Sequence, residues 1–229
     1  MTSTDLAYEH LKQLILTGQL GPGEELREVG LTESTGYGRS PVREALRRLV
    51  QEGFVEVRPR QGYRVAVVTL ADVRDLFEMR LLLEPAAVEF AALRASDEDL
   101  DALHQLAHRT YVHGDAHSYE RFLQDNRDFH VRIAQAAGNE RLARTLRVLL
   151  EEMQRLFALS LRDRDLTTEV MHEHHDLHDA LKARDAARAR EIVVAQIGAS
   201  RARVLEGLIA VTGRTADGVV LADTQRRPG

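Results

Sequence analysis

The chain has 229 residues, of which 44% are hydrophobic and 29% are charged, so it is long enough to form one large or two small domains with a sizeable core. It contains no cysteine, which excludes disulfides, thiolate metal sites and a cysteine nucleophile. No apolar run approaches the roughly 20 residues that cross a bilayer, and the opening MTSTDLAYEH lacks the pattern of a signal peptide. We therefore expect a soluble cytoplasmic protein without a membrane partner.

The net charge of −5 is unusual for a nucleic-acid binder, but the charges are unevenly distributed. Residues 1–68 carry nine basic and nine acidic residues, and within this region residues 39–64 hold seven arginines against three glutamates. Phosphate binding depends on a local basic patch more than on the sum over the chain. The charge pattern therefore leaves nucleic-acid binding open for the N-terminal third.

Three helices are expected in the first 53 residues. DLAYEHLKQLILTG has apolar residues at helical spacing and ends at Gly18, and REVGLTESTG follows the turn GPGEEL as a short second helix. The third helix lies in SPVREALRRLVQEG, where Ser40 suits the N-cap, Pro41 suits the first helical position and Gly53 ends the helix. The period then changes, because FVEVRPRQGYRVAVV alternates apolar and polar residues around a turn. This alternation predicts a β-hairpin.

Three helices followed by a hairpin is the element order of a winged helix-turn-helix. From residue 70 onward there is no strand pattern, and turn signals separate about six helices over residues 70–211. Pro85 lies inside the first of these and predicts a kink or a break. The expected fold class is mainly α, with a winged helix-turn-helix in residues 1–68, an all-helical bundle in 69–211 and a disordered tail in 212–229.

The arginines at the start of the third helix point to DNA. The N-terminal end of a helix is already positive, so cations there are disfavoured unless an anion such as phosphate is expected. A helix-turn-helix places this end in the major groove, where arginine pairs with guanine or phosphate. The alternative is a solvated arginine face, but the hairpin and the local charge favour DNA. The expected contacts are Arg39, Ser40, Arg43 and Arg47 on the helix and Arg60, Gln61 and Gly62 at the hairpin tip.

Three stretches carry a family resemblance: LILTGQLGPGEEL, GRSPVREALRRLVQEGFVEVRPRQGYRV and DLFEMRLLLEPAAVEFAA. They resemble the GntR family of bacterial transcription factors, in the FadR-like subgroup with an all-helical ligand-binding FCD domain, over roughly residues 6–211. The resemblance implies that Arg39, Ser40, Arg43, Gln61 and Gly62 occupy DNA-contacting positions. The chain departs from the family pattern at Val29, Thr35 and Gly38, so operator preference does not transfer.

Nine of the ten histidines lie between residues 104 and 178. The FCD resemblance implies a divalent metal site with Asn126 at the position of an aspartate, His130 and His174 at two histidine positions and Gln196 at a third. Two imidazoles and two neutral amides would hold Zn or Ni weakly unless a further ligand completes the set. The alternative is a polar pocket in which the two histidines form hydrogen bonds. HEHHD is not a zinc-protease HExxH motif, because Asp176 takes the place of the second histidine.

Arg80 matches a recurrent arginine of the FCD domain, which implies an anchor for a ligand carboxylate. The alternative is an internal ion pair with Glu84, four residues further along the helix. The expected effector-binding set is Arg80, Asn126, His130, His174 and Gln196.

The sequence thus predicts a ligand-responsive, sequence-specific regulator that binds double-stranded operator DNA as a homodimer. In this family such a protein is usually a repressor, and we expect its release by a small organic acid rather than any enzymatic activity. One alternative is a regulator whose effector is the metal itself. The other is a metal-dependent enzyme using the histidines, which leaves residues 1–68 unexplained and lacks a general base at a defined spacing.

Overall fold

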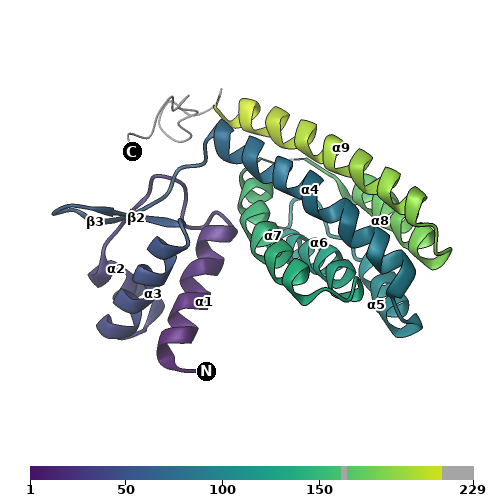
Figure 1. The fold of residues 1–229 in the computed structure, drawn as a ribbon. Helices are drawn as coiled ribbons and strands as arrows, with labels where there is room; N and C mark the ends of the chain where they lie inside the picture. Colours follow the sequence, from purple (N-terminus) through teal and green to yellow (C-terminus); the bar gives the residue numbers. More distant parts are fainter. Residues whose placement is uncertain (161–163, 213–229) are drawn as a thin grey trace, which may run out of the picture. The chain divides into compact units, whose positions relative to one another are not determined.

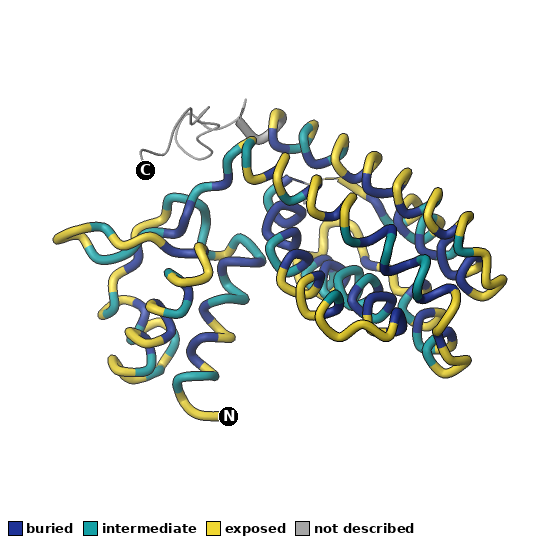
Figure 2. Tube along the Cα trace, viewed as in Figure 1, coloured by how far each residue is buried: buried dark blue, intermediate teal, exposed yellow. Residues whose placement is uncertain are grey.

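The computed structural model describes residues 1–160 and 164–212, so the tail expected at 212–229 lies outside the described residues except for Thr212. Residues 1–70 and residues 71–210 form two compact units, each with its own buried interior (Figure 2). In the described ranges no helix has the length and apolar character needed to cross a membrane.

The N-terminal unit contains three helices and a small antiparallel sheet (Figure 1), as a winged helix-turn-helix requires. Its elements are α1 (Ser3–Leu16), β1 (Glu25–Leu26), α2 (Glu28–Thr35), α3 (Arg39–Gln51), β2 (Val55–Arg58) and β3 (Gly62–Val65). The sheet order is β1-β3-β2, and the β2–β3 register pairs Val55 with Val65 and Arg58 with Gly62. The expected winged helix-turn-helix is confirmed.

Strand β1 was expected only as a turn. It pairs with β3 through Glu25–Arg64 and Leu26–Tyr63, and the N–H of Val65 donates to the carbonyl of Glu24 at 2.9 Å. Two residues are too short for an alternating pattern to reveal a strand.

The apolar stripe of α3 forms the centre of this unit's core. Val42, Leu46 and Leu49 are fully buried, in one cluster with Leu11 and Ile15 of α1. Each such side chain contributes about 1.5–3 kcal/mol through burial. This packing fixes which face of α3 is left for solvent.

The expected start of α3 was wrong by two residues. The helix begins at Arg39, and its N-cap is Gly38, which has an extended backbone and makes no side-chain cap. Ser40 is therefore not the cap, and Pro41 is the third helical position rather than the first. Proline is tolerated there because the first-turn N–H groups have no intrahelical partner.

The second unit is all-helical, which confirms the expected bundle (Figure 1). Its described elements are α4 (Leu70–Arg94), α5 (Asp97–Ala107), α6 (Ala116–Ala136), α7 (Glu140–Ser160), α8 (Thr167–Lys182) and α9 (Ala186–Thr212). Helix α6 packs on α5 and α7, and α5 also packs on α8. One core cluster joins Ala87 of α4, Val131 of α6 and Leu146 of α7. These contacts hold α6 and α8 in place for the pocket described below.

Helix α4 runs unbroken through Pro85, so of the kink or break that the sequence predicts, the break is not observed. Proline removes the hydrogen bond of its own backbone nitrogen, and its ring crowds the carbonyl four residues before it, so a helix that passes through a proline needs support from packing. Pro85 and its neighbours Glu84 and Ala87 are buried, and their packing holds both halves of the helix in place.

Candidate nucleic-acid interface and ligand pocket

The connection between α2 and α3 is a three-residue turn that depends on glycine. Gly36 ends α2 with a φ of 76°, a left-handed conformation that favours glycine. Tyr37 follows and is partly buried against the core, and Gly38 then caps α3. The turn therefore presents the first residues of α3 to solvent.

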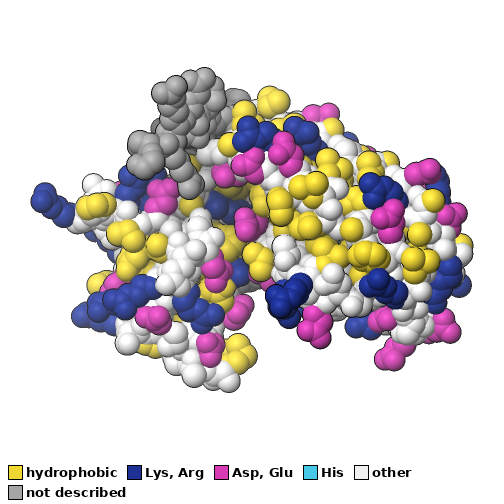
Figure 3. Space-filling model, viewed as in Figure 1, with side chains coloured by type: hydrophobic (Ala, Val, Ile, Leu, Met, Phe, Trp, Pro, Cys, Tyr) yellow, Lys and Arg dark blue, Asp and Glu magenta, His cyan; other side chains and the backbone are white. Residues whose placement is uncertain are grey.

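All four residues expected to contact DNA from α3 are exposed. They are Arg39, Ser40, Arg43 and Arg47, and they lie opposite the buried stripe of the helix. Figure 3 shows Lys and Arg side chains gathered at the hairpin tip and over α2 and α3. The unit thus presents a basic surface at the end of the helix that a helix-turn-helix inserts into the groove.

Arg43 is held by a carboxylate that the sequence patterns did not reveal. Its Nε donates to Glu28 Oε1 at 2.9 Å and its Nη2 to Glu28 Oε2 at 2.7 Å, linking α3 to α2. The hydrogen bond from Arg43 lowers the pKa of Glu28 from its ordinary value, so this carboxylate is ionised at neutral pH. Arg43 must exchange Glu28 for any phosphate or base that it binds.

The hairpin tip carries Arg60 and Gln61, both exposed. Arg60 has a φ of 67°, and Gly62 at the start of β3 has a φ of 103°. A Cβ at Gly62 would lie 3.0 Å from the carbonyl oxygen of Leu26. The glycine therefore allows close pairing of β3 with β1, a structural role that the sequence did not suggest.

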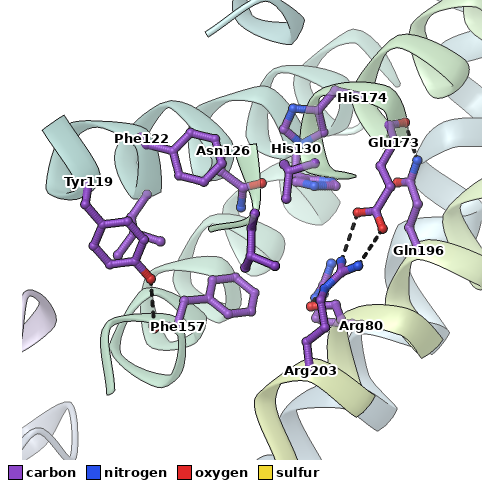
Figure 4. A pocket seen from close by; sticks show the side chains of 14 residues that line it. Arg80, Tyr119, Phe122, Asn126, His130, Phe157, Glu173, His174, Gln196 and Arg203 are labelled. Carbon is purple, nitrogen blue, oxygen red and sulfur yellow. Dashed lines mark hydrogen bonds and ion pairs between the residues drawn. The ribbon is translucent and has the colours of Figure 1, made fainter. Parts of the chain in front are cut away.

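The five residues of the expected effector set line one pocket of the helical unit (Figure 4). Arg80 comes from α4, Asn126 and His130 from α6, His174 from α8 and Gln196 from α9. The cavity has a volume of about 40 Å³. A water molecule needs roughly 10–15 Å³ on this scale, so a ligand that leaves the walls in place has only a few heavy atoms.

The pocket has an apolar side and a charged side, which Figure 4 shows on opposite sides of the cavity. The apolar side is lined by Tyr119, Phe122, Leu123, Phe157, Leu166 and Val170. Tyr119 is held by a hydrogen bond from its hydroxyl to the carbonyl of Phe157 at 3.1 Å. A matching ligand has a polar head and a short apolar body.

On the charged side, Arg80 forms the internal ion pair that was the alternative to ligand binding. Its Nε donates to Glu84 Oε1 at 2.5 Å, and Glu84 Oε2 lies 3.3 Å from His130 Nδ1. Burial raises the pKa of Glu84, but the charge of Arg80 and the contact with His130 outweigh it and lower the pKa to about 2. Glu84 is therefore a fixed buried anion.

A second arginine–carboxylate pair in the pocket was missed by sequence reasoning. Arg203 of α9 donates to both carboxylate oxygens of Glu173 of α8, at 2.8 and 3.0 Å. The side chain of Arg203 is only 12% exposed. The two residues are 30 positions apart on different helices, so no local spacing signals the pair. Both pocket arginines thus already have a carboxylate partner.

The four residues expected as metal ligands line the same pocket, but they do not offer a complete set of ligand atoms for a metal ion. The rings of His130 and His174 are 5.5 Å apart between centroids, and His174 stacks on Phe129. Burial, with smaller contributions from nearby histidines, holds the pKa of His174 well below its usual value, so its imidazole is neutral. Gln196 donates its amide N–H to the backbone carbonyl of Glu173. In residues 1–160 and 164–212 no three His, Cys, Asp or Glu side chains stand ready to hold a metal ion.

Two family models match the chain. The model of bacterial regulatory proteins of the gntR family matches residues 4–65, and the FCD domain model matches residues 75–199. The chain is 34% identical over 203 residues to the HTH-type transcriptional repressor GlaR of Escherichia coli K12, covering 84% of this chain and 92% of GlaR. It is 30% identical over 185 residues to the Nta operon transcriptional regulator of Aminobacter aminovorans, covering 81% and 86%.

Among solved structures, the fold is similar to McbR/YncC of E. coli, with a TM-score of 0.77 and 25% identity over 90% of this chain and 98% of that one. Both units of the chain therefore have counterparts in a solved structure.

Proposed function

The chain belongs to the GntR family of bacterial regulatory proteins and carries an FCD domain, and we propose that it is a repressor that binds operator DNA as a homodimer and leaves it when a small organic acid binds the helical unit. The relatives named above are transcriptional regulators. The observation that carries the ligand-responsive part is the amphipathic pocket that unites five residues from four helices. Such a regulator works in the cytoplasm, where the DNA is.

The homodimer is supported by an exposed apolar stripe on α4. Met79, Leu82 and Leu93 are 40%, 70% and 68% exposed, and hydrophobic side chains gather over this helix (Figure 3). The spacing of these residues places them along one side of the helix. A second copy of the chain is the occupant that fits, because two half-sites on DNA require two recognition helices related by two-fold symmetry.

The dimer is tested by sedimentation of the full-length protein with Leu82→Glu and Leu93→Glu together. We expect a monomer that binds operator DNA more weakly. Val112→Glu, at an equally exposed position outside α4, is the control and should remain a dimer. A double variant that stays dimeric would move the interface elsewhere.

The acid effector is supported by the charges of the pocket. Arg80 cannot easily leave Glu84, because a buried carboxylate without a partner is strongly destabilising. Glu173 is only partly buried, so it can turn toward solvent and yield Arg203 to an incoming carboxylate. We therefore assign the anchoring of the acid mainly to Arg203, with Arg80, Asn126, His130, His174 and Gln196 shaping the polar wall.

Replacement of Glu173 by the effector as the partner of Arg203 would couple effector binding to DNA binding. The Glu173–Arg203 pair joins α8 to α9, so its loss changes how these helices are held. A ligand shifts the equilibrium between two arrangements only by its differential affinity for them. The acid must therefore bind better to the arrangement of the dimer that fits DNA less well.

The experiment is a thermal-shift screen of the full-length protein with small mono- and dicarboxylic acids, followed by operator-release assays on the acids that stabilise it. Arg203→Ala should abolish the response. Glu173→Gln removes one of the two carboxylates that pair with Arg203, so it should tighten acid binding and weaken operator binding even without acid. Arg201→Ala, an exposed arginine two positions away on α9, is the matched control. Acids that stabilise the protein without changing operator binding would contradict the effector role.

A weakened site for Zn²⁺ or Ni²⁺ is a second candidate for the same pocket. Glu84 faces Nδ1 of His130, the outer-shell arrangement that directs the other imidazole nitrogen toward a metal. His130 and His174 would hold the ion with the amide oxygens of Asn126 and Gln196, and a bound ion would supply positive charge for the acid. Asn126→Asp with Gln196→His should tighten metal binding, because these ligands donate more strongly. Equal, negligible metal content in both proteins by elemental analysis would leave a metal-free polar pocket.

A further inference from the structure

One wall of the effector pocket carries polar side chains whose hydrogen-bonding atoms are unused. Asn126, His130 and His174 line the pocket, and Figure 4 shows them next to one another at the edge of the cavity. His174 is only 5% exposed, and in the described part of the chain neither nitrogen of its ring forms a hydrogen bond. The same is true of the side-chain amide of Asn126. A buried polar group without a partner is uncommon, so these atoms point to a ligand.

The chemistry of this wall matches an uncharged group that both donates and accepts. His174 is buried without a carboxylate partner, which keeps its ring neutral, with one donor and one acceptor nitrogen. Asn126 offers an amide N–H and a carbonyl oxygen. His130 Nδ1 lies 3.3 Å from the carboxylate of Glu84, which only accepts, so Nδ1 carries a proton and Nε2 is left for another partner. A hydroxyl satisfies such a wall, because it donates once and accepts twice.

The charges of the pocket leave room for one carboxylate. The buried Glu84 neutralises Arg80, and Glu173 pairs with Arg203. When Glu173 turns to solvent, as the function proposed above requires, one positive charge becomes available to the ligand. Glu169, which approaches Nη1 of Arg203 at 3.5 Å, already compensates part of that charge. A second carboxylate on the ligand would therefore be buried without a cation of its own, which is strongly unfavourable.

We propose that the effector is a short hydroxy acid with a single carboxylate, and that its hydroxyl is bound by His174 and Asn126. This inference rests on the function proposed above, because it takes Arg203 as the anchor of the carboxylate. The cavity volume of about 40 Å³ limits the acid to a few heavy atoms. The apolar side, which includes Phe122 and Phe157, covers its hydrocarbon chain.

His174 is suited to discriminate between acids because packing holds its ring. The ring stacks on Phe129, with 4.1 Å between the centroids and an angle of 24° between the planes. A side chain that is already ordered binds a hydroxyl with little further loss of conformational entropy. An acid without the hydroxyl displaces water from His174 and Asn126 and leaves both without a partner. The pocket therefore distinguishes acids of equal length by their hydroxyl group.

The test is calorimetric titration of the full-length protein, in the presence of EDTA, with acids of one chain length: butyrate, 2-hydroxybutyrate, 3-hydroxybutyrate and succinate. We expect at least one hydroxy acid to bind roughly tenfold more tightly than butyrate, and succinate to bind most weakly. His174→Phe keeps a ring that can stack on Phe129 and should remove the preference for the hydroxyl. Asn126→Leu should reduce the preference from the other helix. His172→Phe, at an exposed position of α8 outside the pocket, is the matched control and should retain it.

Two results would overturn the hydroxy-acid inference while leaving an acid effector in place. One is butyrate or succinate binding as tightly as both hydroxy acids. The other is a preference for the hydroxyl that persists in His174→Phe and Asn126→Leu proteins whose melting temperatures show that they are folded. A preference that appears only when ZnCl₂ replaces EDTA would assign the hydroxyl to a metal ion and would also overturn it. If no acid of this set or of the screen binds, the proposed acid effector fails as well.

Discussion

The DNA-binding surface and the effector pocket both contain arginine–glutamate pairs, but in different surroundings. Arg43 and Glu28 meet at the surface, where the arginine side chain is 52% exposed. Arg80 and Glu84 are almost completely buried inside the helical unit. Surface ion pairs contribute little and are screened by salt, whereas separating a buried pair leaves an unpaired charge in a poorly solvated site. An arginine–glutamate pair can therefore exchange its partner at the DNA-binding surface, but it is fixed inside the helical unit.

The third pair, Arg203 and Glu173, lies between these limits. The arginine is largely buried, but its glutamate reaches the pocket wall and is partly exposed. In the function proposed above, this intermediate pair is the one that a carboxylate ligand opens. Pairs that a ligand can exchange are therefore the exposed ones, and pairs that hold the fold are the buried ones.

The largest effect is expected from Arg80→Ala, which leaves Glu84 buried without its cation. We predict a loss of about 3–5 kcal/mol in the free energy of unfolding, measured by denaturant titration. Arg144→Ala removes an exposed i,i+4 arginine–glutamate pair of α7 and is the matched control. It should cost only roughly 0.3–0.5 kcal/mol. Similar losses in the two variants would contradict the distinction between fixed and exchangeable pairs.

The same pair predicts how stability depends on pH. The pKa of Glu84 is about 2 in the folded protein and ordinarily 4.5, so its ionised form stabilises the fold. That stabilisation is complete above 4.5 and is lost as the pH falls toward 2. Glu84→Gln should therefore flatten the stability profile over this interval, as measured by denaturant midpoints. A profile as steep as that of the native protein would assign the acid sensitivity to other carboxylates.

A smaller loss, in DNA affinity rather than stability, is expected from Arg39→Ala and from Arg43→Ala. An arginine that reads a base contributes roughly 1–3 kcal/mol to specific binding, whereas a phosphate contact weakens all sequences alike and lowers the salt dependence. Anisotropy titrations over a range of salt concentrations distinguish the two. If both variants bind DNA with native affinity at all salt concentrations, α3 is not the recognition helix.

The smallest expected effect is a gain in DNA affinity. Glu28→Gln frees Arg43 and removes a negative charge beside the expected phosphates, so DNA binding should tighten at low salt. Glu33→Gln, an exposed glutamate of the same helix, controls for the change in net charge. An equal gain in DNA affinity in both variants would show that the effect comes from the change in net charge and not from the release of Arg43 by Glu28.

What the sequence predicted well depends on local patterns. The α3 stripe of Val42, Leu46 and Leu49 determines which face is buried, and the exposure of Arg39 and Arg43 follows from it. The pocket set was found through a family resemblance, because its members come from four helices.

Most of the features that the sequence did not predict depend on tertiary contacts. The Glu28–Arg43 and Glu173–Arg203 pairs join different helices, and no spacing along the chain marks them. Strand β1 exists only because β3 pairs with it. The cap of α3 moved from Ser40 to Gly38 because an extended glycine can begin a helix without a side-chain cap. The two pairs and the strand thus depend on contacts between distant segments, whereas the shift of the cap is local.

The most direct test of the central claim is selection of random double-stranded DNA by the purified full-length protein, followed by titration of the enriched sequence with and without the stabilising acid. We predict a two-fold symmetric site, bound less tightly when the acid is present and less tightly by Arg39→Ala, but equally well by Arg144→Ala. Failure to enrich any sequence, or enrichment of a site whose affinity no acid of the screen changes, would contradict a ligand-responsive DNA-binding regulator.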